Sequence, residues 1–515
     1  MAQILHIPVP DPADQDLEYP LLGVANEQEG RALFRIAMPL ALQNVLITIT
    51  STICVIMVGN TSSTSSINLD ASSLAVMYSN ISGLSIGLGM TYGLDTLYAN
   101  ANGSKSGGDR RLAALYTQRC LVILVLACIP ITIANIFTQP FLVYILQQPV
   151  DMSIGAAKFS HCLLPGLPFI FINTVMSKSL QSRSVVMPTV VVGLVSNAFN
   201  LFLCYLLLNV FNFEFYFAAW SRTIASVVAP ILTMIYFFYA DLVDLLWRPW
   251  KTSLVCEPVA LWRFFCLSFH SFVMIVGEWW AFEFTYVMTG WLPDPETAVA
   301  AHTILFTINV VKYVGYGGIA SATSIRIGNH LGYAKHGAAK ASAMISIGAS
   351  LAIAIFLIII STLAIRPTAM LYSHDKDVVD MAVSCIIPVG VSELGYALLM
   401  TSGGVLRGCG QQRIGSVFIV IGYLLGLPLA YYLSLQIGLS GIWWGNAFAL
   451  VFAAVLSLAY IFCIDWVDAA ETTRLRLEAD QSKESSDEYD QDEDALSDTS
   501  SVSDDCQSVD AFVAC

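Results

Sequence analysis

The sequence predicts an all-α polytopic membrane protein with twelve transmembrane helices in two pseudo-symmetric lobes of six helices each. Three observations support this class: few charged residues, twelve apolar segments of membrane length, and an internal repeat. Of the 515 residues, 56% are hydrophobic and 12% are charged, whereas soluble domains carry about 25% charged residues. The composition therefore excludes an ordinary soluble protein.

The twelve apolar segments are each long enough to cross the hydrocarbon core, which takes roughly 20 residues of helix. They cover residues 32–58, 71–99, 112–138, 154–177, 185–210, 215–240, 260–292, 298–326, 342–365, 378–402, 414–436 and 440–464. Lys and Arg gather in the loops after the even-numbered segments, as in Arg110-Arg111 and Lys335. Because cytoplasmic loops are the positively charged ones, we expect both termini to be cytoplasmic. The sequence leaves open whether the membrane is the plasma membrane or a vacuolar or endosomal one.

The two halves of the chain repeat with a nearly constant offset of 228 to 230 residues. The equivalent pairs are Arg35 with Arg263, Gly103 with Gly332, and Arg183 with Arg413. Six helices per repeat give both lobes the same orientation, and a substrate site is expected between such lobes. The predicted organisation is an N-lobe over 31–240, a linker over 241–257 and a C-lobe over 258–465, between acidic tails over 1–30 and 466–515.

The acidity of the chain lies in its tails. Residues 471–515 carry 14 acidic and three basic residues, and residues 1–30 carry six acidic residues, against a total net charge of −14. A Ser-rich acidic segment buries too little apolar surface to fold, so we expect the C-terminal tail to be disordered.

No motif in the sequence indicates an enzyme. The twelve cysteines include no C-x-x-C pair, and no nucleotide-binding loop, nucleophile elbow or metal-ligand cluster occurs. We therefore expect no cofactor and no metal, and no nucleic-acid partner. The expected partners of a monomeric protein of this kind are the lipid bilayer, a small-molecule substrate and protons.

The segment 260–292 contains two carboxylates, Glu278 and Glu283, within an aromatic, apolar run. A charge at this depth costs at least a few kcal/mol, so each must be paired, face water or exchange a proton. The two are five residues apart and point about 140° away from each other on a helix. By the repeat offset they correspond to Thr50 and Val55, so the C-lobe is predicted to carry proton coupling.

Four other polar groups within the membrane segments are candidates for a role in transport. Lys312 should pair with Glu278, Glu283 or Glu393, because an unpaired ammonium would be costly there. Glu393 either makes such a pair or takes part in transport. Asp95 could line the substrate cavity or pair with a nearby arginine, Arg110 or Arg111, and His302 could relay protons or be a hydrogen-bonded structural histidine.

Aromatic residues surround the two glutamates of segment 260–292. They could line a cavity through cation–π contacts, or they could face lipid and neighbouring helices. They are Trp279, Trp280, Phe282, Phe284 and Tyr286.

Several short motifs occur together at a characteristic spacing. They are Pro39 with Gln43-Asn44, Asp95-Thr96-Leu97 ending at Gly103, Glu278-Trp279-Trp280, Ser324 to Asn329 with Gly332, and Ser402 to Gly408. With them, residues 30–465 resemble the multidrug and toxic compound extrusion (MATE) family on its eukaryotic side. The resemblance implies a twelve-helix, two-lobe fold and secondary active efflux of organic cations, usually in exchange for protons.

The resemblance also assigns roles to residues. It implies that Glu278 and Glu283 are the acidic pair of the seventh helix. It implies polar cavity positions at Gln43 and Asn44 in the first helix and at Asn80 and Asp95 in the second.

The chain departs from the family at three positions of the C-lobe. It has Thr307 and Tyr396 where animal-type members usually have glutamate, and Tyr316 where a proline is usual. Glu393 lies one turn before Tyr396 and could supply the missing carboxylate from the same face. With Lys312 also present, these changes leave room for an anionic or neutral substrate.

We therefore expect a transporter that exchanges protons for organic cations or xenobiotics by alternating access. The alternatives are an exporter of organic anions or secondary metabolites, a lipid-linked flippase and a non-transporting membrane scaffold. The flippase is disfavoured by the small number of intramembrane bases, and the scaffold by the repeat and the buried acids. Glu278, Glu283 and Glu393 are the predicted coupling residues.

Overall fold

The computed structural model describes residues 22–59, 66–104, 110–247 and 249–482, and within them the backbone forms only helices, turns and loops. Eleven helices of this part are long and apolar enough to cross a membrane. A twelfth crossing is the uninterrupted helical run from Ser66 to Asn102, which a π-helical turn divides into three elements. The predicted all-α class with twelve crossings is confirmed.

The first half of the chain supplies six crossings. They are α2 (Leu22–Gly59); α3 (Ser66–Ser79), η2 (Asn80–Leu84) and α4 (Ser85–Asn102); α5 (Arg110–Ile136); α7 (Val150–Leu163), η4 (Leu164–Gly166) and α8 (Leu167–Ser182); α9 (Met187–Tyr205) and η5 (Leu206–Val210); and α10 (Phe217–Tyr239). Short helical turns, α6 (Thr138–Pro140) and η3 (Phe141–Ile145), follow α5.

The second half supplies the other six crossings. They are α12 (Pro258–Thr289), α13 (Pro295–Gly332), α14 (His336–Tyr372), α15 (Lys376–Ser384) with α16 (Ile386–Gly408), α17 (Gln412–Ile437) and α18 (Leu439–Cys463). Each predicted segment coincides with one of these runs, and the main differences are helices that extend beyond the apolar stretch into polar residues. Apolar length predicts where a helix crosses lipid but not how far it continues into water.

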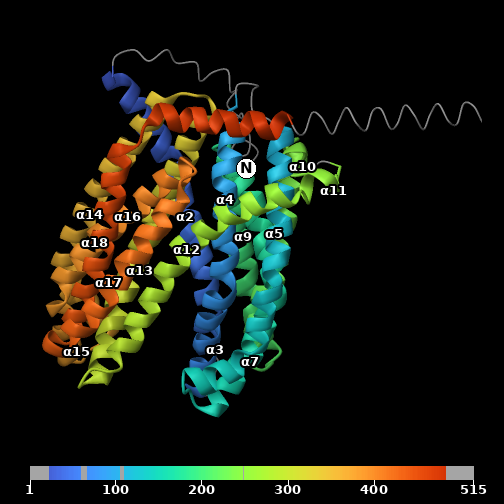
Figure 1. Cartoon of the computed structure of the whole chain (residues 1–515). Helices are drawn as coiled ribbons and strands as arrows, with labels where there is room; N and C mark the ends of the chain where they lie inside the picture. Colours follow the sequence, from blue (N-terminus) through green and yellow to red (C-terminus); the bar gives the residue numbers. More distant parts are fainter. Residues whose placement is uncertain (1–21, 60–65, 105–109, 248, 483–515) are drawn as a thin grey trace, which may run out of the picture.

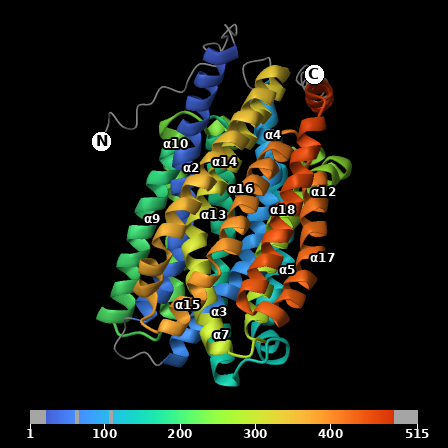
Figure 2. The ribbon, with the colours of Figure 1, turned by 90° about the vertical axis from the view of Figure 1, so that its left-hand side faces the viewer.

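The two halves form separate bundles that meet closely at one end and diverge toward the other (Figure 1). Figure 2 shows the same helices from the side, with the start of α2 and the end of α18 at the same end of the molecule. We call this end, where the lobes are in contact, the sealed end. At the opposite end α15 lies in one bundle and α3 and α7 in the other (Figure 1).

Repeat-related residues face one another at the sealed end. A Cβ on Gly103 would lie 2.1 Å from the carbonyl oxygen of Asn329, and a Cβ on Gly332 would lie 2.3 Å from that of Asn100. Asn100 and Asn329 are separated by the same 229 residues as the two glycines. A contact in which residue i meets j and the equivalent of j meets that of i is the mark of a two-fold relation. Glycine is needed at both positions because the two backbones approach too closely for a side chain.

The outer surface of both bundles is apolar. Val125, Leu363 and Leu371 are 67%, 80% and 83% exposed, and many other large apolar side chains are exposed with them. Apolar surface on this scale indicates contact with a membrane. The structure is therefore that of a multi-pass integral membrane protein.

The segments outside the crossings are more ordered than the sequence suggested. The expected linker forms short helices, η6 (Val243–Leu245) and α11 (Thr252–Val255), in which Leu245 and Val255 are fully buried. Residues 466–482, placed in the expected disordered tail, form a helix. We call it the bridging helix. The rest of that tail and the expected N-terminal tail up to residue 21 lie outside the described residues.

Candidate functional site

Charged and tyrosine side chains from three helices meet inside the C-lobe. Glu278 comes from α12, Lys312 and Tyr316 from α13, and Glu393 and Tyr396 from α16. We call these five residues the C-lobe acid cluster. The two carboxylates are almost completely buried, with 4% of Glu278 and 1% of Glu393 exposed.

Both carboxylate oxygens of Glu393 accept hydrogen bonds from side chains of the protein. Lys312 Nζ donates to its Oε2 over 2.5 Å, and Tyr316 Oη donates to its Oε1 over 3.0 Å. Lys312 also donates to Ser361 Oγ on α14 over 3.0 Å. Lys312 and Tyr316 are one turn apart on α13, so they reach the same carboxylate from one face. Of the three acids that the sequence offered to Lys312, the structure selects Glu393.

The carboxyl group of Glu278, unlike that of Glu393, has no lysine partner in the part of the chain that the structure describes. The Tyr396 hydroxyl lies beside its carboxyl group, but none of the described Lys, Arg or His nitrogens makes an ion pair with it within 4.0 Å. Rings of Tyr313 and Tyr396 stack with centroids 3.9 Å apart. The hydroxyls of Tyr313 and Tyr423 are buried without a partner among the described residues. Glu278 is thus a buried carboxyl group in an aromatic site that has free hydroxyls nearby.

Among the other predicted residues of α12, Phe282 lies close to this cluster, with its ring 6.5 Å from that of Tyr396. Glu283 is half-buried. The side chain of Tyr286, one turn further along α12, interacts with it electrostatically. Trp279 and Trp280 are 37% and 52% exposed. Only Phe282 of the predicted aromatic lining is buried, and its ring lies 5.7 Å from that of Tyr313.

His302 is enclosed by aromatic rings in the C-lobe. It is 1% exposed, and neither ring nitrogen has a hydrogen-bond partner among the described residues. Its ring lies 4.7 Å from that of Tyr286 and 5.3 Å from that of Trp443. The hydrogen-bonded structural histidine foreseen as the alternative to a relay is not what the structure contains.

The N-lobe candidates are scattered. Gln43 Oε1 accepts hydrogen bonds from Gln181 and Thr189 within the N-lobe. The side chain of Asn44 lies against Gly317 of α13, across the lobe interface. Asn80 begins the π-helical turn η2, and its side-chain oxygen is buried without a partner among the described residues. The structure does not bring these residues together into one site.

Asp95 takes part in closing the sealed end. Lys178 Nζ donates to its Oδ2 over 2.7 Å, rather than either arginine considered from the sequence. Lys178 and Arg407, from opposite lobes, lie over the ring of Tyr92 at 4.0 and 5.0 Å. Thr96 Oγ1 donates to the carbonyl oxygen of Arg407 over 2.7 Å. Asp95 is thus part of the structure that joins the lobes at this end.

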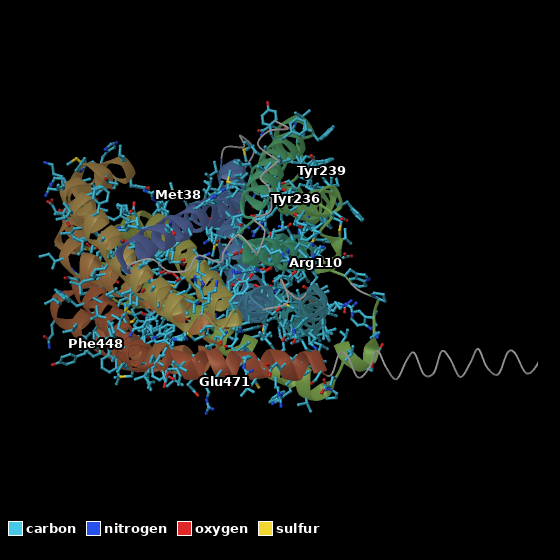
Figure 3. All side chains as sticks on the ribbon, turned by 90° about the horizontal axis from the view of Figure 1, so that it is seen from above. Met38, Arg110, Tyr236, Tyr239, Phe448 and Glu471 are labelled. Carbon is cyan, nitrogen blue, oxygen red and sulfur yellow. The ribbon has the colours of Figure 1, made fainter. Side chains whose placement is uncertain are left out.

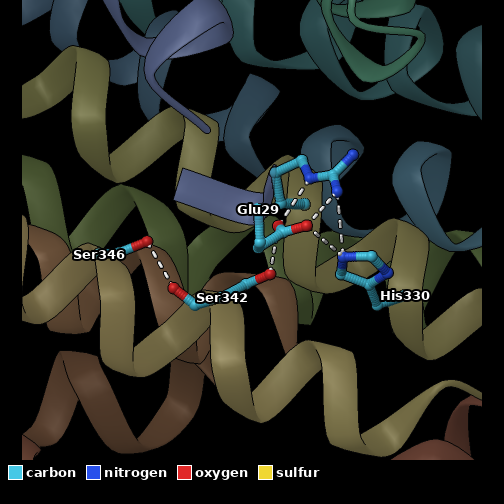
Figure 4. A network of polar contacts seen from close by, with 5 residues as sticks. Glu29, His330, Ser342 and Ser346 are labelled. Atoms are coloured by element: carbon cyan, nitrogen blue, oxygen red, sulfur yellow. Dashed lines mark hydrogen bonds and ion pairs between the residues drawn. The ribbon is translucent and has the colours of Figure 1, made fainter. Parts of the chain in front are cut away.

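A second ion-pair network joins the lobes at the same end (Figure 4). Glu29 of α2 accepts hydrogen bonds from Arg326 of α13 through both carboxylate oxygens. Ser342 Oγ of α14 donates to the same carboxylate over 2.5 Å, and His330 Nε2 lies 3.3 Å from it. Glu29 is buried and Arg326 is largely buried, with 8% and 12% of their side chains exposed. Charge-assisted bidentate pairs of this type are among the stronger polar contacts in proteins.

Within the described residues, no group of three or more His, Cys, Asp or Glu side chains is placed to hold a metal ion. The buried acids are held instead by lysine, arginine, tyrosine and serine. The arrangement offers ion pairing, hydrogen bonding and exchange of a proton at a carboxyl group.

Tyr396 was a predicted substrate-cavity residue, but sequence reasoning missed the role of Tyr316 in the cluster and the network of Glu29. Tyr316 was noted as a departure from a family pattern, although its spacing of four from Lys312 indicated a shared partner. Glu29 was assigned to an acidic tail because of its position, and a charge at a helix start gives no sign of a partner about 300 residues away.

The comparisons with known proteins fit this geometry. Residues 39–206 and 271–432 match the family model described as MatE. Multidrug and toxin extrusion protein 1 of Xenopus tropicalis is 29% identical over 453 residues, which cover 87% of this chain and 77% of the relative. The human protein of the same name is 28% identical over 454 residues, covering 88% and 78%.

Solved structures show the same fold. The crystal structure of the eukaryotic MATE transporter AtDTX14 superimposes with a TM-score of 0.81 at 24% identity, covering 88% of this chain and 99% of that one. The Vibrio cholerae MATE transporter VcmN, in its bent form, gives a TM-score of 0.74 at 13% identity over 88% and 99%.

Proposed function

The chain belongs to the MatE family, and we propose that it is a secondary active transporter that exports organic cations in exchange for protons. The relatives named as multidrug and toxin extrusion proteins support efflux of foreign compounds rather than an enzymatic activity. The C-lobe acid cluster supports exchange of a cation against a proton.

The observation that carries the proposal is the contrast between the two buried carboxylates. Glu393 has both oxygens occupied by Lys312 and Tyr316, so its charge is balanced inside the protein. Among the described residues Glu278 makes no ion pair within 4.0 Å, and the buried Arg407 acts on it only from a longer distance. A buried carboxyl group without a counter-ion in contact is stable when it is protonated or when a mobile cation binds beside it.

This contrast supports Glu278 as the coupling residue. A proton and an organic cation compete for the same carboxyl group, so each leaves when the other binds. The rings of Tyr313 and Tyr396 beside it provide aromatic faces that attract a cation. The lobes then need only expose Glu278 to one side of the membrane at a time, which is the alternating access expected of two repeat-related lobes.

Export of organic anions has less support. Anion export would require Lys312 to bind the substrate, but the Lys312 ammonium is held by Glu393 and Ser361. An anionic substrate would have to displace the Glu393 carboxylate, which lies 2.5 Å from the ammonium. The cost would be comparable to that of breaking a buried ion pair.

We place the sealed end on the cytoplasmic side, because the basic loops lie at the ends of the helices that meet there. In this orientation the described structure is closed to the cytoplasm. Export would then proceed from a second arrangement in which the lobes separate at the sealed end.

The proposal is tested by uptake into proteoliposomes. Purified protein is reconstituted, and uptake of a radiolabelled quaternary ammonium is measured under an imposed proton gradient, an imposed sodium gradient or none. A labelled aromatic carboxylate is measured in parallel. We expect uptake of the cation that depends on the proton gradient. Uptake of the carboxylate alone would replace the proposal with anion export, and dependence on sodium alone would remove proton coupling.

A further inference from the structure

The bridging helix is amphipathic and has one buried face. Asp465 caps its start by accepting hydrogen bonds from the backbone N–H groups of Val467 and Asp468. The buried positions recur every three or four residues, as on one side of an α-helix. They are Trp466, Ala469, Ala470, Thr473 and Leu477. The opposite face is exposed and carries ion pairs of Arg474 with Glu471 and Glu478.

The first part of the bridging helix is anchored to the C-lobe. Trp466, Ala469 and Ala470 belong to one buried cluster with residues from the ends of α13 and α16, among them Ile327, Leu331, Leu406 and Cys409. Further along, Arg476 lies over Gly410, where an added Cβ would come within 3.0 Å of Arg476 Nη2. Two residues, Ile464 and Asp465, connect the helix to α18. This part is therefore fixed to the C-lobe by both packing and chain connection.

The last part of the bridging helix is anchored to the N-lobe. Leu477 is 6% exposed and belongs to a buried cluster with Leu112 and Tyr116 of α5 and Val255 of α11. One turn on, Tyr116 Oη donates a hydrogen bond to Asp480 Oδ2 over 2.6 Å. Figure 1 shows the helix crossing the sealed end from one bundle to the other, and Figure 3 shows it from that end, with Glu471 on its exposed side.

We propose that the bridging helix is a clasp that holds the two lobes together at the sealed end and must release the N-lobe before this end can open. The distance along the helix from Trp466 to Asp480 is about 21 Å, and a continuous helix does not stretch. Separation of the lobes therefore breaks one of the two anchors. The N-lobe anchor is the smaller one, since it rests on Leu477 and the Tyr116–Asp480 hydrogen bond.

The clasp links the C-terminal segment to the transport cycle. The inference rests on the proposed alternation between lobes, and it adds a control point far from the C-lobe acid cluster. A change that weakens the contacts of Leu477 or Asp480 with the N-lobe raises the population of the arrangement open at the sealed end. A change that strengthens these contacts lowers that population.

The test uses the full-length protein in lipid nanodiscs without substrate, so its result does not depend on a transport assay. Spin labels are introduced through non-natural amino acids at Arg110 on α5 and Lys340 on α14, both exposed at the sealed end. Pulsed electron paramagnetic resonance gives the distribution of the distance between them. Wild type is compared with Leu477→Ala and Leu477→Asp, and with Leu475→Ala as the matched control, since Leu475 is 54% exposed on the same helix.

We expect Leu477→Ala to raise the ratio of long to short distances by roughly tenfold or more, in line with the loss of a buried leucine contact. Leu477→Asp should raise it further, and Leu475→Ala should match wild type. Hydrogen–deuterium exchange of the backbone amides of residues 477–482, followed by mass spectrometry, reports in parallel whether the end of the helix has left the N-lobe. Faster exchange with an unchanged distance distribution overturns the clasp. Unchanged exchange and distances in both Leu477 variants overturn the anchor itself.

Discussion

Removing Lys312 should destabilise the protein through the carboxylate that it leaves behind. In Lys312→Met the side chain keeps an apolar stem of the same length, but Glu393 loses the ammonium at 2.5 Å and keeps only the hydrogen bond from Tyr316. Glu393 is 1% exposed, so water does not replace the lost partner. Breaking a buried pair from one side typically costs about 3–5 kcal/mol, and we expect a loss of this size in the free energy of unfolding.

The assay is a double-mutant cycle of unfolding in detergent micelles, with wild type, Lys312→Met, Glu393→Gln and the double variant. Neutralising both partners removes the stranded charge, so the double variant should lie within about 1–2 kcal/mol of wild type. Arg366→Met is the control, because the Arg366–Asp380 pair is 54% and 59% exposed and exposed pairs contribute only about 0–1 kcal/mol. Equal effects of Lys312→Met and Arg366→Met, or additive effects of the two single substitutions, would refute the reasoning.

Two further predictions concern the contact between the lobes. Gly103→Ala places a Cβ 2.1 Å from the Asn329 carbonyl oxygen and should force the lobes apart at the sealed end, seen as longer distances between labels at Arg110 and Lys340. Gly348→Ala is the control, because nothing lies within 4 Å of the added Cβ. It should stabilise α14 by about 0.5–1 kcal/mol. The same change in label distances in both variants would contradict the close packing at Gly103. Glu29→Gln should cost the closed arrangement about 1.5–3 kcal/mol by weakening the pair with Arg326. Glu27→Gln should change the same distance distribution little, because its pair with Arg31 is exposed, and an equal response to both would argue against the network of Glu29.

The sequence was sufficient to predict the bundle because the length of each apolar segment and the positions of the basic loops depend only on residues that are neighbours in the chain. The repeat offset also predicted a two-fold relation, and the contacts of Gly103 and Gly332 with Asn329 and Asn100 show it directly. Buried charges were equally visible, since Glu278, Lys312 and Glu393 interrupt apolar segments. Their pairing was not, because it depends on how α12, α13 and α16 are rotated against one another, and no local pattern fixes that rotation.

Two errors have the same physical origin. The ionic partners considered for Asp95 were arginines that are near in sequence, whereas Lys178, 83 residues away, reaches it in the folded N-lobe. The bridging helix was hidden by the composition of the whole acidic tail, although Asp465 as a cap and the spacing of Trp466, Thr473 and Leu477 indicated an amphipathic helix. Average composition conceals a short helix whose stability comes from the surface on which it packs.

The central claim is that Glu278 couples the proton to the substrate, and accumulation driven by a pH gradient tests it most directly. Proteoliposomes receive a labelled quaternary ammonium outside, either with a pH gradient or without one, and the label that accumulates inside is measured. A glutamine at Glu278 cannot take part in proton exchange, so Glu278→Gln should abolish accumulation driven by the gradient, while Glu283→Gln retains it. Accumulation by Glu278→Gln at the wild-type level would contradict the account and move coupling to another group. Loss of accumulation in Glu278→Gln, with wild-type behaviour in Glu283→Gln, is the result that the structure predicts.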